Sequence, residues 1–198
     1  IKNFYAFIRQ SKHGENDLNL FSGDNPERTM TLMARLFGSG SYLWEQFARL
    51  QVNNLLPMLK EITDFKKAPS LARLKLNLVE KVENERGFEA KVAVVNAWKD
   101  EELFKVDLRS LVQGSHHFRN FSDEIYRVAE LSLSQIFDLC YEETCNKMTL
   151  NPLEVNHRNW ALLGLGKFGG NELGYASDLE IIVIFKLDGN HPEFNSDF

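Results

Sequence analysis

Cysteine is rare in this sequence, long apolar runs are absent, and basic residues do not outnumber acidic ones. The two cysteines among 198 residues, Cys140 and Cys145, are five positions apart and so off the spacing that shares a helix face, which disfavours a disulfide or a metal pair. No apolar run approaches the roughly 20 residues that cross a bilayer, and residues 1–4 do not open a secretory signal. The net charge of −5 disfavours a general nucleic-acid binder. We therefore expect a soluble, cytoplasmic protein with neither membrane nor nucleic-acid partners.

Helical periodicity dominates the first 150 residues, and the composition can support a core. Hydrophobic residues make up 43% and charged residues 26% of the chain, close to the globular average. Gly38 is placed to end the first helix and Ser122 to cap the last. Residues 100–102, all acidic, suit the first turn of a helix, where they complement its dipole. Residues 89–96 alternate briefly like a strand, although we favour helix. The apolar spacing predicts helices over about 28–37, 43–50, 71–95, 100–112 and 123–141.

The character of the chain changes over residues 149–159, where Pro152 and three asparagines interrupt the helical periodicity. Two short apolar runs follow this interruption. Residues 160–165 suit a buried strand, and residues 179–185 form a second strand that is richer in β-branched side chains. The pattern therefore predicts an α+β chain. Its expected domains are a helical bundle over 1–149 and the N-terminal part of a second domain over 150–198.

A glycine-rich segment, residues 164–174, separates the two expected strands. Glycines after a strand let backbone N–H groups approach phosphate oxygens closely, because no Cβ obstructs them, and a helix that begins there adds its positive end. Gly169 and Gly170 are thus candidates to hold a phosphate. Lys167 could neutralise its charge, although a solvated lysine is the plainer interpretation, and Ser177 could donate to a phosphate oxygen or cap the turn.

Two carboxylates follow the glycine-rich segment at the start of the second expected strand. Asp178 and Glu180 are separated by one residue, so strand alternation turns both to the same face while Leu179 points to the other. Mg²⁺ prefers oxygen ligands and is often held by one or two carboxylates together with substrate phosphates. The pair is therefore a candidate magnesium site, although either feature alone is weak evidence.

The order of these features is more informative than each feature alone. A strand, a Gly-Gly turn, a short helix, a serine and an Asp-x-Glu pair on a second strand occur in this order in the nucleotidyltransferase superfamily to which polymerase β belongs. Residues 166–173 and 177–182 closely resemble the signature of the glutamine synthetase adenylyltransferases, and residues 36–43 and 102–109 are loosely similar to upstream segments of that family. The resemblance implies a polymerase β-like domain after the helical bundle, truncated where the chain ends.

Enzymes of this family attach AMP to a tyrosine of glutamine synthetase and remove it again. The resemblance implies that this chain is an adenylyltransferase with ATP as substrate and Mg²⁺ as cofactor. It also implies glutamine synthetase as the protein substrate, with a nitrogen-signalling regulatory protein as a further candidate partner. The residues that it assigns are Asp178 and Glu180 as catalytic metal ligands, and Gly169, Gly170, Ser177 and Lys167 for nucleotide binding.

Two departures from the family pattern bear on activity. The family usually has aspartate where this chain has Glu180, whose longer side chain moves the carboxylate by about one methylene. The superfamily also uses a third carboxylate on a later strand, which we expect beyond Phe198. Residues 106–109 superficially resemble the segment that carries it, but they precede the turn and follow a helical pattern. We therefore reject Asp107 as the third ligand, and this fragment alone could be inactive.

Two other functions remain open from the sequence. The chain could belong to a nucleotidyltransferase that acts on another acceptor, either a regulatory protein or a small molecule. Alternatively, it could be a non-catalytic regulatory or scaffolding module, in which the helical half binds a partner and Glu180 marks a decayed site. Acceptor identity, the direction of the reaction, oligomeric state and effectors are not determined by these motifs.

Overall fold

The computed structural model describes residues 68–113, 118–148, 160–174 and 177–185. It also describes five separate helical positions in the first 40 residues, which are Glu27, Thr31, Ala34, Arg35 and Gly38. Gly38 is itself helical, one residue beyond the expected range, and its role in ending the first helix stays a prediction. The expected helix over 43–50 and the boundary segment 149–159 lie outside the described residues, so the two expected domains stay a prediction. None of the described helices has the length and apolarity that a membrane span requires.

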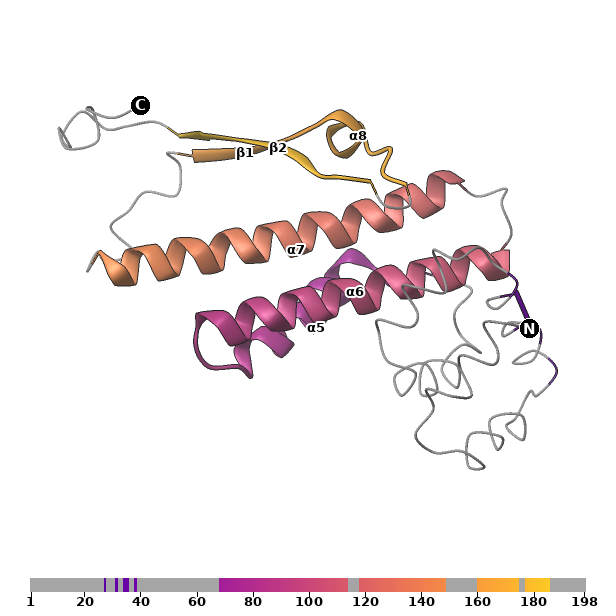
Figure 1. Ribbon diagram of the computed structural model, residues 1–198, viewed down its shortest axis with the longest axis horizontal. Helices are drawn as coiled ribbons and strands as arrows, with labels where there is room; N and C mark the ends of the chain where they lie inside the picture. The colour runs from indigo at the N-terminus through magenta and orange to yellow at the C-terminus, as the bar shows by residue number, and fades with distance from the viewer. Residues whose placement is uncertain are drawn as a thin grey trace.

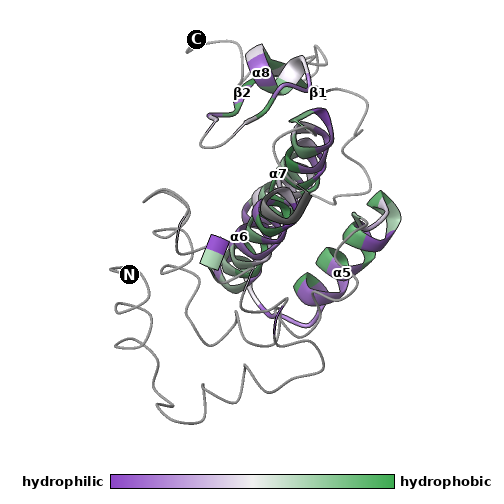
Figure 2. Cartoon of the chain, turned by 90° about the vertical axis from the view of Figure 1, so that its right-hand side faces the viewer, coloured by the Kyte–Doolittle hydropathy of each residue, from purple (hydrophilic) through white to green (hydrophobic). Residues whose placement is uncertain are grey.

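The described residues are mostly helical and carry one small antiparallel sheet, which gives an α+β composition. Figures 1 and 2 show the sheet and α8 on one side of α7 and α6 on the other, so α7 is the middle layer. The strands pair from Trp160 with Phe185 to Leu165 with Glu180. In chain order the elements are α5 (Leu71–Glu83), α6 (Phe88–Gln113), α7 (Phe118–Lys147), β1 (Trp160–Leu165), α8 (Gly166–Gly169) and β2 (Glu180–Phe185).

Helix α5 forms where the apolar spacing predicted a helix, but it is shorter. The side chain of Ser70 caps it by accepting a hydrogen bond from the backbone N–H of Arg73 at 3.3 Å. Its buried residues, Leu74, Leu78 and Val82, follow one another at four-residue intervals. The helix ends before Gly87, whose φ of 86° is a left-handed conformation that glycine adopts readily. The single helix expected over 71–95 is therefore divided by a turn.

Helix α6 continues through both the ambiguous stretch and the acidic cluster. Val95 and Trp98 are 1% exposed, and the indole N–H of Trp98 donates to the side-chain oxygen of Asn77 on α5 at 2.9 Å. Residues 89–96 are thus helical, as we favoured. Because the helix does not restart at residue 100, the expectation that residues 100–102 form a first turn is wrong.

The acidic cluster instead joins helices through ion pairs. Lys105 bonds Glu101 at 2.7 Å and Glu102 at 2.6 Å within α6, and Lys81 of α5 bonds Glu101 at 3.0 Å. Burial raises the pKa of Glu101, but the hydrogen bonds and charges of Lys105 and Lys81 outweigh it and lower that pKa. The cluster is therefore held by cations and not by a helix dipole.

Helix α7 begins at Phe118, before the position where Ser122 was expected to cap it. Ser122 is an interior helical residue, 2% exposed, so the capping role is wrong. Val128 and Leu139 of α7 pack into the core with α5 and α6. The residues that form this core cluster are Leu74, Leu78, Val82, Val95, Trp98, Val128 and Leu139.

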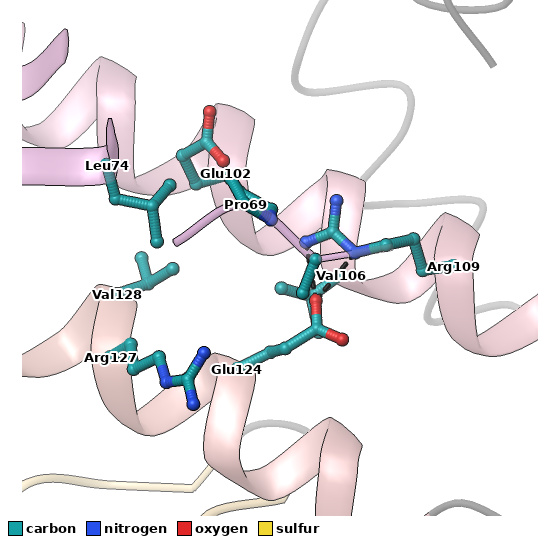
Figure 3. A pocket seen from close by; sticks show the side chains of 9 residues that line it. Pro69, Leu74, Glu102, Val106, Arg109, Glu124, Arg127 and Val128 are labelled. Carbon is teal, nitrogen blue, oxygen red and sulfur yellow. Dashed lines mark hydrogen bonds and ion pairs between the residues drawn. The ribbon is translucent and has the colours of Figure 1, made fainter. Parts of the chain in front are cut away.

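A buried ion pair also joins α6 to α7. The guanidinium of Arg109 contacts the carboxylate of Glu124 at 2.6 Å, with side chains 6% and 13% exposed. Figure 3 shows the two meeting beside a hollow that Pro69, Leu74 and neighbouring side chains line. That hollow encloses about 10 Å³, which is at the lower limit for a single water molecule. It is therefore a packing feature and not a substrate pocket.

The two strands lie where the apolar runs predicted them, but the expected burial of the first strand is wrong. Leu163 and Leu165 of β1 are 45% and 39% exposed, and Ile182 and Ile184 of β2 are 46% and 52% exposed. The reason is that the described sheet has only two strands, so the described chain does not enclose it as the faces of larger parallel sheets are enclosed.

Glycines let α8 fold back against the end of β1. A Cβ on Gly169 would overlap the backbone carbonyl of Gly164, and a Cβ on Gly164 would come within 2.9 Å of the Phe168 ring. Gly170 differs, because a Cβ there would meet the Gly166 carbonyl oxygen at 3.4 Å, and its φ of −84° is ordinary. Of the adjacent glycines, only Gly169 is thus required by close packing.

Asp107 is a buried acid on α6. It is 8% exposed, and burial raises its pKa from 3.8 to about 7. Since the folded protein holds this proton more tightly than the unfolded chain does, ionisation opposes folding. The stabilising contribution of the neutral acid is complete below pH 3.8 and is lost as the pH rises through about 7.

We expect Asp107→Asn to stabilise the protein at neutral and alkaline pH, because an amide avoids the buried charge. A pKa difference of this size corresponds to at most about 4 kcal/mol at pH 8 and less than about 2 kcal/mol at pH 5. Urea unfolding of both proteins across this pH range measures the gain, with the exposed Asp138→Asn as the control. A gain that does not change with pH would contradict the assignment.

The neighbouring glycines should respond differently to alanine. Gly169→Ala forces α8 away from β1 and should lower the free energy of unfolding by about 1–3 kcal/mol. Gly170→Ala has space and a compatible φ, so its effect should stay within roughly 0.5–1 kcal/mol. Urea unfolding of the two variants compares them directly, and equal losses would show that the close packing of Gly169 is not limiting.

Candidate functional site

The glycine-rich segment connects the end of β1 to the start of β2 through α8. Strand pairing sets Leu165, the last residue of β1, opposite Glu180, the first residue of β2. The sheet therefore returns the acidic segment to the point where the glycines begin. Gly166, Lys167, Gly169 and Gly170 are all exposed, so this bend faces solvent and is not enclosed by the described chain.

The glycine-rich bend meets the acidic segment where Gly166 lies against the carboxylate of Glu180. A Cβ on Gly166 would lie 2.6 Å from one carboxylate oxygen of Glu180 and 3.2 Å from the other. Gly166 also has a φ of 52°, a conformation that L side chains rarely adopt. The carboxylate can occupy this place only because residue 166 is glycine, so the two motifs that the sequence separates meet here.

Asp178 lies two residues before Glu180 and outside the strand, since β2 begins at Glu180. Both acids are exposed. The alternation that was expected to align them begins only at Glu180, so their sharing of one metal ion stays a prediction. Within the described ranges, no group of three or more His, Cys, Asp or Glu side chains could hold a metal ion.

The backbone of the bend is largely occupied by its own hydrogen bonds. The N–H of Gly170 donates to the carbonyl of Gly166 at 3.0 Å, that of Asn171 to Phe168 at 3.2 Å, and that of Glu172 to Lys167 at 2.8 Å. In this conformation the backbone N–H of Gly170 is therefore already hydrogen-bonded within the turn. Phosphate binding by Gly169 and Gly170 stays a prediction, and for Gly170 it would require this bond to be shared or replaced.

Ser177 closes the next turn towards β2. Its hydroxyl oxygen accepts a hydrogen bond from the N–H of Gly174 at 3.0 Å, and its own N–H donates to the Gly174 carbonyl at 3.3 Å. A serine hydroxyl can accept and donate at once. Its donation to a phosphate is compatible with this geometry and stays a prediction.

Sequence reasoning missed the contacts that hold the bend in place. On α7, the hydroxyl of Ser122 donates to the carbonyl of Leu173 at 2.7 Å, and the carboxylate of Asp123 accepts from the side chain of Asn171 at 2.7 Å. The ring of Tyr126 lies 5.4 Å from that of Phe168. Helical spacing places these α7 residues on one face, but it does not reveal what that face contacts.

The residues present suit Mg²⁺ in chemistry, though they supply only part of a full coordination shell. Both Asp178 and Glu180 carry oxygen ligands, and the space above Gly166 is filled by a carboxylate and not by a Cβ. Asp107 lies on α6, in the layer on the far side of α7 from the sheet (Figure 1). This separation is consistent with its rejection as a third ligand.

Curated relatives of this chain are named bifunctional glutamine synthetase adenylyltransferase/adenylyl-removing enzyme. The protein from Chromobacterium violaceum is 28% identical over 167 residues, which cover 84% of this chain and 17% of that relative. The one from Nitrosomonas eutropha is 33% identical over 91 residues, covering 46% of this chain and 8% of that relative. This chain thus spans a small fraction of the length of these relatives. No solved structure matches it.

The family model for glutamate-ammonia ligase adenylyltransferase matches residues 30–196. This range includes the helices α5 to α7, the glycine-rich bend and both candidate carboxylates. The match therefore rests on most of the chain and not on the short motif alone. On this evidence, the chain belongs to the glutamate-ammonia ligase adenylyltransferase family.

Proposed function

We propose that this chain contributes the nucleotide-binding bend and two metal-ligating carboxylates to a Mg²⁺-dependent nucleotidyltransferase that uses ATP and acts on a tyrosine of glutamine synthetase. The observation that carries the proposal is the contact between Gly166 and the Glu180 carboxylate. Family membership supports the reaction class. The name of the curated relatives supports glutamine synthetase as the protein substrate.

The charge of the bend supports the need for a divalent cation. Glu180 carries its carboxylate beside Gly166, the first residue of α8. A triphosphate brought to the glycines would meet this negative charge. Mg²⁺, when bound, would neutralise that repulsion and polarise the phosphate. Asp178 and Glu180 would hold the cation, Lys167 would add a positive charge, and Gly169, Gly170 and Ser177 would orient the phosphates.

The proposed transfer needs no covalent enzyme intermediate. For adenylylation, the tyrosine oxygen bonds to the α-phosphorus of ATP, the bond from that phosphorus to the β-phosphate oxygen breaks, and pyrophosphate leaves with the electron pair. The tyrosine proton passes to solvent. For removal, a phosphate oxygen bonds to the AMP phosphorus, which yields ADP, and the tyrosine oxygen leaves with the electron pair and takes a proton from solvent. Catalysis would rest on positioning and charge neutralisation.

We also propose that a third carboxylate completes the metal site, and that further strands of a polymerase β-like sheet pair with the exposed strands. A nitrogen-signalling protein is a further proposed partner. The free thiols of Cys140 and Cys145 support the cytoplasm as the proposed compartment.

Calorimetry can test the site assignment directly. We expect Mg²⁺-dependent ATP binding that weakens at least tenfold in Asp178→Ala and in Glu180→Gln, because each variant removes a charged ligand. Asp138→Ala, at an exposed position further along α7, is the matched control and should bind as the parent does. Unchanged affinity in both site variants would remove the assignment.

The acceptor and the direction of transfer need a separate measurement. Incubation with α-labelled ATP and glutamine synthetase should label the acceptor tyrosine, and added phosphate should release the label as ADP. Label on a different acceptor would support a nucleotidyltransferase of other specificity. Absence of ATP turnover by the complete protein that contains this chain would favour the non-catalytic module.

A further inference from the structure

We propose that Ser122 and Asp123 of α7 are positioning residues for the nucleotide site, because their side chains hydrogen-bond the glycine-rich bend and hold it against α7. This inference rests on the proposed function. Neither residue belongs to the glycine-rich motif, and their partners in it, Leu173 and Asn171, lie 51 and 48 positions later in the chain. They act through residues 171–173, which lead from α8 towards Ser177 and the acidic pair.

Ser122 supplies a buried anchor. It is 2% exposed, and Leu173, whose carbonyl accepts its hydroxyl at 2.7 Å, is 1% exposed. A buried carbonyl that loses its donor keeps its desolvation penalty, so this bond is costly to break. Leu173 also packs with Phe168 and Ala129. The end of the bend is therefore held by both a hydrogen bond and apolar contact.

Asp123 supplies the second anchor, at Asn171, a residue of the turn with positive φ. Its carboxylate accepts the side-chain N–H of Asn171 at 2.7 Å. Asn171 has a φ of 54°, the left-handed region that asparagine tolerates better than most residues. The bond therefore restrains the residue at which the chain reverses.

The two anchors connect to the candidate site through the bend's own backbone. Hydrogen bonds from residues 170, 171 and 172 run back to Gly166, Phe168 and Lys167. Gly166 in turn lies against the carboxylate of Glu180. A shift of residues 171–173 would thus be transmitted to the point where the glycines meet the acid.

The same turn of α7 is also attached to α6. Glu124, next to Asp123, forms the buried ion pair with Arg109 of α6. The start of α7 is therefore held to α6 on one side and holds the bend on the other. Loss of a contact with the bend should leave this attachment intact, which allows the two effects to be separated.

Hydrogen exchange of the chain tests the anchoring itself. Ser122→Ala and Asp123→Ala should accelerate exchange of the Gly170, Asn171 and Glu172 amides by about fivefold to tenfold, with little change in α5 and α6. Ser132→Ala is the matched control, since it removes a buried hydroxyl of α7 that bonds Val128 at 2.8 Å and does not reach the bend. Unchanged exchange in both anchor variants would overturn the proposal.

The KM for ATP, measured in the complete protein, separates positioning from a merely structural role. The anchor variants should raise this KM several-fold while Ser132→Ala leaves it unchanged. Asp123→Asn keeps a side-chain oxygen as acceptor and should largely restore the value seen before substitution. Faster exchange of the bend with an unaltered KM for ATP would show that the anchors are structural only, which would overturn the positioning role.

The two hypotheses fail in different ways. If the parent protein binds no Mg²⁺-ATP, the proposed function fails, and the positioning role fails with it even where exchange shows the anchors. If the parent binds Mg²⁺-ATP and the anchor variants bind it equally well, only the positioning role fails.

Discussion

The contact of backbone with backbone between Gly169 and Gly164 is the constraint on which the candidate site depends. The chain leaves β1, turns through α8 and returns within one short segment. Gly169 can approach the Gly164 carbonyl only because it carries no Cβ, and a Cβ on Gly164 would meet the Phe168 ring. Gly166 also lacks a Cβ, and the Glu180 carboxylate occupies the space that a Cβ would fill. If α8 moved outwards to accept a side chain at residue 169, the glycines would no longer face the acid. The position of the charged groups in the bend therefore depends on the close packing of its glycines.

Helix α7 joins this constraint to the rest of the molecule. One side of it contributes Val128 and Leu139 to the core with α5 and α6, while another holds Phe168 and Leu173. A single rigid element is therefore shared by the helical part and the sheet. The boundary between the two expected domains stays a prediction, and the contacts of α7 with Phe168 and Leu173 join residues from both sides of it. The bend and the helical core therefore both pack against α7.

Regular elements with strong periodicity could be predicted from the sequence, whereas long-range partners could not. The stripe of Leu74 and Leu78 predicted α5, and the two apolar runs predicted the strands within a residue of their limits. Ser122 was mistaken for a cap because serine before an apolar stripe has that pattern, while its partner Leu173 is 51 positions away. Residues 100–102 resembled a first turn because acidic residues favour that position, but Lys105 and Lys81 satisfy them in mid-helix. At the site, the motif located the glycines and acids, but the contact between Gly166 and Glu180 depends on how β1 and β2 pair, which the motif does not specify.

The buried carboxyl of Asp107 makes the heat of unfolding depend on the pH and on the buffer. With a pKa of about 7, the group is about half protonated in the folded protein at that pH and almost fully ionised in the unfolded chain. Unfolding there releases about half a proton, which the buffer must absorb. The heat of melting will therefore include the buffer's own enthalpy of protonation. Scans in phosphate and in an amine buffer will report different apparent enthalpies for the same structural transition.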